Sequence, residues 1–370
     1  MNGRFMQQSF AGVQRYGHEL LKAWDRMLDS GEVDRSLYSI EVLAPQGELS
    51  NAPVLRHIPI RQAGRLHGPA WVQLDLPRLS RDGLLFSTSG AHPVLALGSG
   101  RMNVVTVHDL SYLVYPRAYS LGFHAFYRSL IPIIFARADA IITVSNLGRA
   151  GILQYYPKAS ERVHVIYNGA PAIGRPEIKR RQLIDRKLPP WPFVLWVGSL
   201  SKRKNPQGLI DAIQILRRNH DIGLLMAGAG HRSFKDARLK IPPEIADRVW
   251  LLGQVDDEAE LADLYEHALC LAFPSFYESF GLPVMEAMAY GTAVVASTAG
   301  SLPEVAGDAA ILVDPSDVGA LADAIGRVAT DADLRADLIH RGKARVRLFS
   351  WDSCGRETLN LLAGILDKAA

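Results

Sequence analysis

Two glutamates with seven residues between them stand in the run Glu278-Ser-Phe-Gly-Leu-Pro-Val-Met-Glu286. Pro283 favours the first turn of a helix, so we expect a helix to begin just after Gly281. Such a turn presents backbone N–H groups that attract a phosphate. Glu286 could then accept hydrogen bonds from a ribose, and Glu278 from a sugar. The alternative is that one glutamate caps the helix and the other is merely solvated. The aromatic and glycine context favours a binding site.

A cationic loop is the second candidate. The strand-like Trp196-Val-Gly198 leads into Ser199-Leu-Ser-Lys-Arg203-Lys204-Asn-Pro206, where a helix should begin. Positive charge at a helix N-terminus is locally unfavourable. It makes sense if a diphosphate bridges the cations and the helix end. The alternative is a solvated loop whose charges point outward.

The first half of the chain offers His108 and Gly12. His108 follows an apolar run and should stand at the carboxyl end of a parallel strand, where open α/β sheets bind ligands. A histidine there can contact substrate hydroxyls or a leaving proton, although a lone histidine is more often structural. Gly12 opens a helix and permits close approach of a ligand to the backbone. No GxGxxG pattern is present, so a nicotinamide fingerprint is not supported.

The elements that position these residues alternate between β-rich runs and helical patterns, which predicts an α/β fold with parallel sheets. In the first half we predict a helix at 12–28 and strands at 103–108, 140–145 and 163–167. The pattern then restarts, with strands at 193–198, 222–228, 249–253, 268–273 and 292–297 and helices near 205–219, 257–267, 283–290 and 316–329. Two doubly wound, Rossmann-like domains follow from this repetition.

The domain boundary is marked by dense proline, glycine and charge around residues 168–192. We predict an N-terminal domain at 1–170, a linker at 171–192, a C-terminal domain at 193–345, and a C-terminal helix at 346–370 that crosses back to the N-terminal domain. A doubly wound domain normally opens with a buried strand. The start at Asn2 leaves little room for one, so either that strand is very short or leading residues are missing.

The composition is that of a globular protein, with 370 residues, 48% hydrophobic and 21% charged, a length that suits two domains. Two cysteines exclude a disulfide framework, and no Cys/His spacing suggests a metal site. No apolar stretch is long enough to span a bilayer, and no signal peptide is apparent. We therefore predict a cytoplasmic protein.

Charge is unevenly distributed. Residues 1–172 carry 17 Lys/Arg and 12 Asp/Glu, whereas residues 188–370 carry 18 and 24. A basic first half indicates either an anionic partner, such as the inner face of the cell membrane, or ordinary surface variation. Peripheral membrane attachment is thus an open alternative, and we expect no nucleic-acid partner.

Together these residues resemble the retaining glycosyltransferases of family 4, which have the GT-B fold of two Rossmann-like domains with a cleft between them. The resemblance covers nearly the whole chain, and its most specific part is the Glu278 segment. The other segments that resemble the family are Val107-His-Asp-Leu-Ser111, Val144-Ser-Asn146, Tyr167-Asn-Gly169, the Arg203-Lys204-Asn205 loop and Gly300-Ser-Leu-Pro-Glu304. The N-terminal Asn2-Gly-Arg-Phe and Ala11-Gly-Val-Gln-Arg-Tyr16 look like the mannosyltransferase-like branch that builds bacterial polysaccharides.

The resemblance implies a donor site in the second half. Arg203 and Lys204 would bind the diphosphate of a nucleotide-sugar, Glu286 the ribose, and Glu278 the transferred sugar. Backbone near Val255 would meet the base. Phosphate and sugar would also be held by the amides of Phe280, Gly281 and Leu282.

The resemblance implies further contacts at the reacting centre. Gly12 would leave room for the donor phosphates across the cleft, and His108 would contact the sugar, so His108 and Glu278 are the catalytic candidates. Gly198 and Ser199 would line the donor loop. Many relatives have arginine where this chain has Ser199, which leaves phosphate neutralisation to the two cations farther along the loop.

The implied reaction moves a hexose to an acceptor hydroxyl with retention and without a metal or other cofactor. GDP-mannose is the favoured donor by branch resemblance, with UDP-glucose and deoxysugar nucleotides open. The acceptor would be a glycan or a lipid-linked precursor of polysaccharide. A sugar-nucleotide 2-epimerase and a non-catalytic nucleotide-sugar binder are the alternatives from other classes. The epimerase would need acid/base residues that the pattern does not show.

Overall fold

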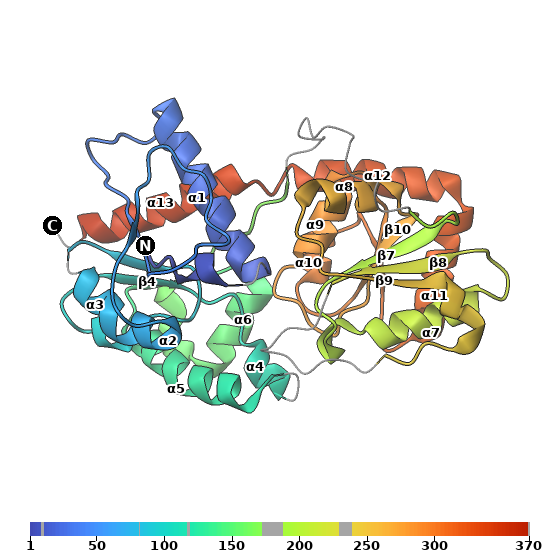
Figure 1. Ribbon diagram of the computed structural model, residues 1–370, viewed down its shortest axis with the longest axis horizontal. Helices are drawn as coiled ribbons and strands as arrows, with labels where there is room; N and C mark the ends of the chain where they lie inside the picture. The colour runs from blue at the N-terminus through green and yellow to red at the C-terminus, as the bar shows by residue number, and fades with distance from the viewer. Residues whose placement is uncertain (9–10, 81, 117–118, 172–187, 229–238, 369–370) are drawn as a thin grey trace. The chain divides into compact units, whose positions relative to one another are not determined.

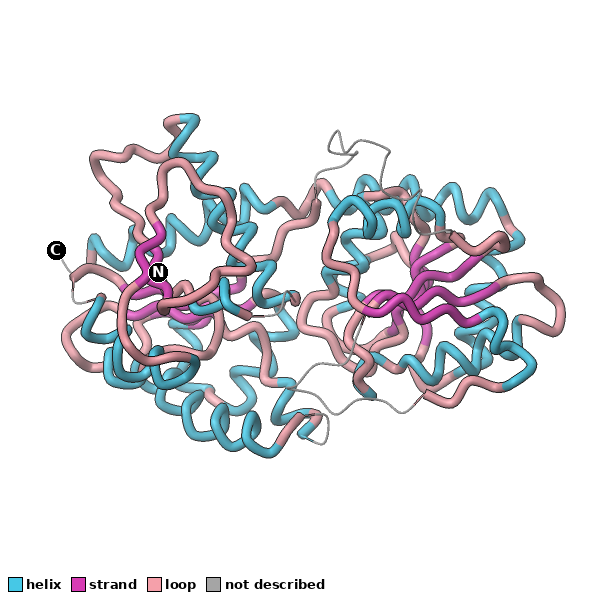
Figure 2. The backbone as a smooth tube through the Cα atoms, viewed as in Figure 1, coloured by secondary structure: helices cyan, strands magenta, loops and turns pink. Residues whose placement is uncertain are grey.

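The computed structural model describes residues 1–370 except 9–10, 81, 117–118, 172–187, 229–238 and 369–370. Contacts divide the chain into two units. The first comprises Met1–Leu110, Gly122–Gly169 and Trp351–Ala370, and the second comprises Ser111–Leu121 and Ala170–Ser350. Both contain parallel sheets flanked by helices, so the predicted α/β class of two Rossmann-like units is confirmed (Figure 2). Most of the predicted linker, 171–192, lies outside the described residues.

The first unit is built on parallel strands β1 (Val42–Ala44), β2 (Ile60–Gln62), β3 (Leu85–Ser87), β4 (Asn103–Thr106), β5 (Ala140–Thr143) and β6 (Val163–Val165). Its sheet order is β3-β4-β5-β6, with β1-β2 as a separate pair. Asn2 forms parallel bridges to both Leu43 and Ser87, and so connects the pair to the larger sheet. In the described residues before β1, these single-residue bridges stand where the opening strand was expected.

The helices of the first unit are α1 (Gly12–Ser30), α2 (Gly68–Ala70), α3 (Leu76–Leu79), α5 (Leu121–Arg137), α6 (Asn146–Tyr155) and α13 (Trp351–Asp367). Shorter turns are η1 (Arg4–Gln7), η2 (Trp71–Asp75), η3 (Val94–Ala96) and η5 (Pro157–Arg162). The buried side chains of α1 include Tyr16, Leu20, Leu21, Trp24 and Leu28.

Helix α13 packs along α1 (Figure 1). The indole N–H of Trp24 donates to the carbonyl oxygen of Gly355 at 3.0 Å. A Cβ at Gly355 would lie 3.0 Å from the Ala23 methyl group, so glycine lets the two helices approach closely at this point. The chain therefore returns to the first unit at its C-terminal end.

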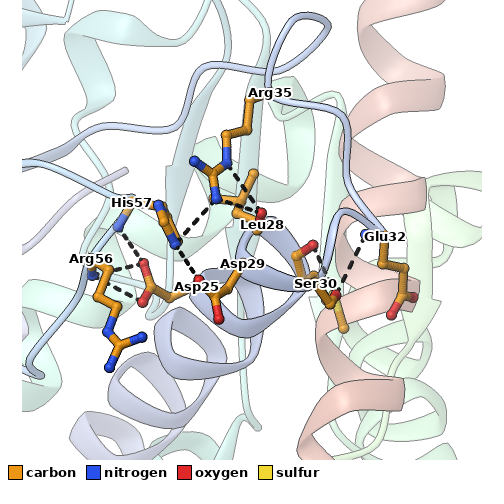
Figure 3. Close-up of polar contacts among 9 residues, drawn as sticks. Asp25, Leu28, Asp29, Ser30, Glu32, Arg35, Arg56 and His57 are labelled. Atoms are coloured by element: carbon orange, nitrogen blue, oxygen red, sulfur yellow. Dashed lines mark hydrogen bonds and ion pairs between the residues drawn. The ribbon is translucent and has the colours of Figure 1, made fainter.

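Asp25 connects α1 to a distant loop (Figure 3). Its carboxylate accepts the backbone N–H groups of Arg56 at 3.0 Å and His57 at 2.8 Å, and its side chain is buried. Arg35 donates to the Leu28 carbonyl oxygen near the helix end. The C-cap of α1 is Gly31, with φ of 77°.

Asp25→Ala is expected to lower the free energy of unfolding of the first unit by about 2 kcal/mol, because two backbone donors lose their acceptor. Urea denaturation followed by circular dichroism measures this loss. Asp29→Ala is the matched control, since Asp29 stands on the same helix in an exposed ion pair with His57. The control should cost less than about 1 kcal/mol, and equal losses in the two variants would contradict the assignment.

The second unit has one parallel sheet of β7 (Phe193–Val197), β8 (Gly223–Ala227), β9 (Val249–Gly253), β10 (Cys270–Phe273), β11 (Val294–Ser297) and β12 (Ile311–Val313). Its order is β12-β11-β10-β7-β8-β9. This is the order of a doubly wound dinucleotide-binding sheet, and the strand order reverses between β7 and β10. The eight strands predicted from the sequence in the two halves all form within a few residues of the expected ranges.

The helices of the second unit are α4 (Ser111–Val114), α7 (Pro206–Leu216), α8 (Glu258–His267), α9 (Leu282–Ala289), α10 (Leu302–Ala306), α11 (Val318–Thr330) and α12 (Ala332–Val346), with turns η6 (Lys202–Lys204) and η7 (Pro243–Arg248). In Figure 1, α7 and α11 cover one face of the sheet and α8, α9 and α12 the other. The core includes Trp196, Ile210 and Ile325. No helix in the described ranges is long and apolar enough to cross a membrane.

Candidate donor site of the second unit

The candidate site lies where the strand order of the second unit reverses. The loop after β7 carries Gly198, Ser199, Arg203 and Lys204, and the loop after β10 leads to Glu278. Because β7 and β10 are adjacent and parallel, both loops leave the same edge of the sheet. Ligands of open α/β sheets bind at such a switch point.

A buried ionic cluster forms there. The Lys204 Nζ lies 2.6 Å from Oε1 of Glu278, and an Arg203 guanidinium nitrogen lies 3.1 Å from the same oxygen. All three side chains are largely buried. The alternative of outward-pointing charges is therefore excluded for these two cations. Burial alone raises the pKa of Glu278, but Lys204 and Arg203 outweigh it and hold that pKa below its usual value.

Each member of the cluster is held by its surroundings. The Lys204 ammonium stands 4.6 Å from the centre of the Phe273 ring, a cation–π geometry. Arg203 also donates to the Tyr277 carbonyl oxygen, and its own carbonyl oxygen accepts the Phe276 N–H at 2.8 Å. The charged groups are thus preorganised before any ligand arrives.

Two glycines shape the loops around the cluster. A Cβ at Gly300 would lie 2.5 Å from the Glu278 backbone nitrogen, and Gly300 has φ of +67°. The next residue, Ser301, donates its N–H to the Glu278 carbonyl oxygen at 3.0 Å. Gly198, with φ of +154°, runs beside the Lys204 stem, because an added Cβ would lie 3.6 Å from its Cδ. Ser199 is half-buried, and its hydroxyl approaches that of Ser201 at 3.5 Å.

The turn before α9 has the predicted form. Gly281 is the N-cap, with φ of 100°, and supplies no side-chain cap to a helix that begins at Leu282. The Phe280 ring is buried and meets Phe349 edge-on, with ring centres 5.7 Å apart. Glu286 is also buried, one turn into the helix. A helix N-terminus with a glycine cap is suited to an anion.

Val255 is half-buried in the loop after β9. Strand β9 is separated from β7 only by β8 in the parallel sheet. Its carboxyl end therefore opens at the same edge as the other two loops. The strand ends are also joined directly, because the Gly228 N–H donates to the Gly253 carbonyl oxygen at 2.7 Å.

The remaining candidates, Gly12 and His108, belong to the first unit. Gly12 is exposed at the start of α1, and Tyr16 follows one turn later. The Tyr16 ring meets the His108 ring edge-on at 5.0 Å between centres. Nε2 of His108 lies 3.0 Å from the Thr88 carbonyl oxygen, which can only accept, so Nε2 carries the proton. Burial lowers the pKa of His108, so its Nδ1 is an acceptor at neutral pH.

Three side chains at the site have no sequence motif that marks them. Tyr265, on α8, donates its hydroxyl to Oε2 of Glu286 at 2.7 Å. Phe273 faces Lys204. Tyr115 donates to the Phe276 carbonyl oxygen at 3.0 Å, and its ring centre lies 5.7 Å from that of Tyr277. Tyr115 comes from the segment 111–121, which packs in the second unit. An aromatic residue in an apolar pattern gives no signal of such a partner.

Two parallel-sheet units, one with an ionic cluster at a dinucleotide-type switch point, are the architecture expected of a GT-B glycosyltransferase. Residues 177–345 match the family model described as glycosyl transferases group 1, and residues 10–172 match that described as Glycosyltransferase Family 4. An O-antigen chain mannosyltransferase B of Escherichia coli is 32% identical over 269 residues, which are 70% of this chain and 69% of the relative. The chain therefore belongs to glycosyltransferase family 4 and is a transferase.

A second relative and a solved structure agree with this assignment. An O-antigen chain mannosyltransferase of Salmonella typhimurium is 27% identical over 263 residues, covering 71% of this chain and 70% of the relative. The structure of sucrose-phosphate synthase from Thermosynechococcus elongatus has a TM-score of 0.74 at 22% identity, covering 100% of this chain and 98% of that one. That likeness supports the GT-B fold.

Proposed function

We propose that this glycosyltransferase moves mannose from GDP-mannose, with retention at the anomeric carbon, to a hydroxyl of a glycan or lipid-linked acceptor in polysaccharide synthesis. The observation that carries the donor site is the cluster of Arg203, Lys204 and Glu278 at the switch point. The choice of mannose is supported by the O-antigen mannosyltransferases among the relatives. Attachment to an anionic membrane surface stays a prediction from the charge distribution.

The assigned roles follow from charge and position. The bond between the anomeric carbon and the diphosphate oxygen breaks, and negative charge develops on the leaving diphosphate. Arg203, Lys204 and the amides at 280–282 stabilise that charge through groups that are already in place. The acceptor oxygen forms the new bond on the same face, and its proton goes to the leaving phosphate. Glu278 holds the hydroxyls of the transferred sugar and orients both cations.

The other assignments stay predictions. Glu286 binds the ribose, Gly198, Ser199 and backbone near Val255 line the nucleotide, and no cofactor takes part. For Gly12 and His108 we keep the roles implied by the family resemblance, close approach to the donor phosphates and contact with the sugar.

Calorimetric titration with GDP, UDP, ADP and dTDP tests the donor site. We expect GDP to bind most tightly, and Glu286→Ala to weaken that binding about tenfold or more because hydrogen bonds to a charged acceptor are lost. Glu48→Ala, at an exposed glutamate of the first unit, is the control and should bind as wild type. Tightest binding of UDP would replace mannose by glucose or an amino sugar in the proposal. Absence of binding to all four nucleotides would refute the donor site.

A further inference from the structure

A buried tyrosine holds the carboxylate that we assign to the ribose. Tyr265 lies on α8 and Glu286 on α9, and both side chains are buried. The phenol O–H donates to Oε2 of Glu286 at 2.7 Å, as a charge-assisted hydrogen bond does. Two helices on one face of the sheet therefore share a buried polar contact.

The phenol itself is fixed from several sides. Its ring stacks on Tyr290 with ring centres 5.8 Å apart and an interplanar angle of 18°. The backbone carbonyl of Tyr265 accepts the Thr292 hydroxyl at 2.6 Å. Thr292 follows the end of α9, so this contact fixes α8 relative to α9 a second time. The hydroxyl of Tyr265 is consequently a rigid donor, and it limits the rotation of the more flexible glutamate side chain.

Rigidity has a consequence for recognition. A glutamate has three side-chain torsions, and ordering such a chain when the ligand binds costs free energy. A carboxylate held in advance avoids that cost. It can accept hydrogen bonds from two vicinal hydroxyls only when the lone pairs of its oxygens point toward both hydroxyls. A ligand that lacks a hydroxyl then forgoes a hydrogen bond to this carboxylate.

We propose that Tyr265 is a positioning residue that fixes Glu286 for the ribose diol and thereby makes the donor site selective for ribonucleotides over deoxyribonucleotides. This rests on the proposed function, in which Glu286 binds the ribose. It also narrows the donor class, because deoxythymidine-based donors lack the 2′-hydroxyl.

The test compares GDP, 2′-deoxy-GDP and 2′,3′-dideoxy-GDP by calorimetry with wild type and Tyr265→Phe. Wild type is expected to bind the 2′-deoxy compound about tenfold more weakly than GDP, and the dideoxy compound more weakly still. Tyr265→Phe keeps the ring and removes one oxygen atom. It should weaken the binding of GDP about fivefold to tenfold and change the affinity for dideoxy-GDP less than twofold. If UDP binds best, the uridine series replaces the guanosine series.

Two further variants separate positioning from folding. Adding Tyr265→Phe to Glu286→Gln should cause no additional loss of GDP affinity, because the carboxylate to be positioned is already absent. Tyr155→Phe, at an exposed tyrosine of the first unit, is the matched control and should bind as wild type. Thermal melting checks that each variant is folded.

The outcomes of the two hypotheses differ. Equal losses for GDP and dideoxy-GDP in Tyr265→Phe would show a purely structural role and overturn the positioning proposal. So would unchanged GDP binding, or a further loss in the double variant. Failure of wild type to bind any nucleoside diphosphate would instead overturn the proposed donor site.

Discussion

Glu278→Gln is expected to reduce the rate of sugar transfer by a hundredfold or more while the fold is retained. The carboxylate is 6% exposed and its Oε1 is shared by Lys204 at 2.6 Å and Arg203 at 3.1 Å. A neutral amide of the same shape leaves two buried cations side by side without their counter-charge. Such cations move apart or toward solvent, and the groups that should meet the diphosphate lose their preorganised positions.

The measurement is kcat and KM for GDP-mannose with a glycan acceptor, together with thermal melting. Loss of an interaction made chiefly in the transition state lowers kcat more than it raises KM. Glu48→Gln at an exposed position serves as the control and should keep wild-type kinetics. A Glu278→Gln enzyme within a few-fold of wild type would show that the cluster is structural and that the sugar is held elsewhere.

The first unit is expected to lose stability as the pH falls from about 6.5 to about 4, because of His92. Its side chain is fully buried, with Nδ1 2.9 Å from the Ser87 hydroxyl and Nε2 2.9 Å from Oδ1 of Asn103. Burial lowers the pKa of His92 from 6.5 to about 4. The unfolded chain therefore takes up a proton between these pH values while the folded chain does not, so stability present above pH 6.5 is lost, by about 3 kcal/mol.

Hydrogen exchange of strands β3 and β4 at pH 7.5, 6.0 and 4.5 measures this effect within the first unit, after correction for intrinsic exchange rates. His92→Gln keeps polar groups at the position without a proton to gain. It should be less stable than wild type at pH 7.5 but lose less stability on acidification. His267→Gln, at an exposed histidine of the second unit, is the control and should follow wild type. Parallel slopes for wild type and His92→Gln would refute the assignment.

The strands were predictable from the sequence to different degrees. Strands β7, β8 and β10 are continuous apolar runs, which is how buried parallel strands are recognised. Strands β1, β2 and β3 have only three residues each, too few for a periodic signal. Before β1, Asn2 alone forms bridges, one to β1 and one to β3. A contact of one residue depends on tertiary neighbours and leaves no local pattern.

The residues of the candidate site were also predictable only in part. Arg203 and Lys204 were recognisable because positive charge before a helix N-terminus is unfavourable unless an anion binds there. Glu278 was recognisable by its aromatic and glycine context. The pairing of the two cations with the glutamate could not be inferred from the sequence. Glu278 lies 74 positions after Lys204, and the two come together only because β7 and β10 are adjacent in the sheet. Tyr265 was not recognisable at all. It occupies an apolar position of α8, and its hydroxyl acquires a role only when α9 packs beside it.

The return of α13 to the first unit determines the order in which the chain can complete its fold during synthesis. Residues 351–367 pack along α1, with Trp24 bonded to Gly355 and Trp351 beside Tyr16 at 6.3 Å between ring centres. Every residue of the second unit precedes them in the chain. On the ribosome, which releases the N-terminal end first, the second unit can therefore close while the first still lacks its last helix. The half of the molecule that is synthesised first is the half that is finished last.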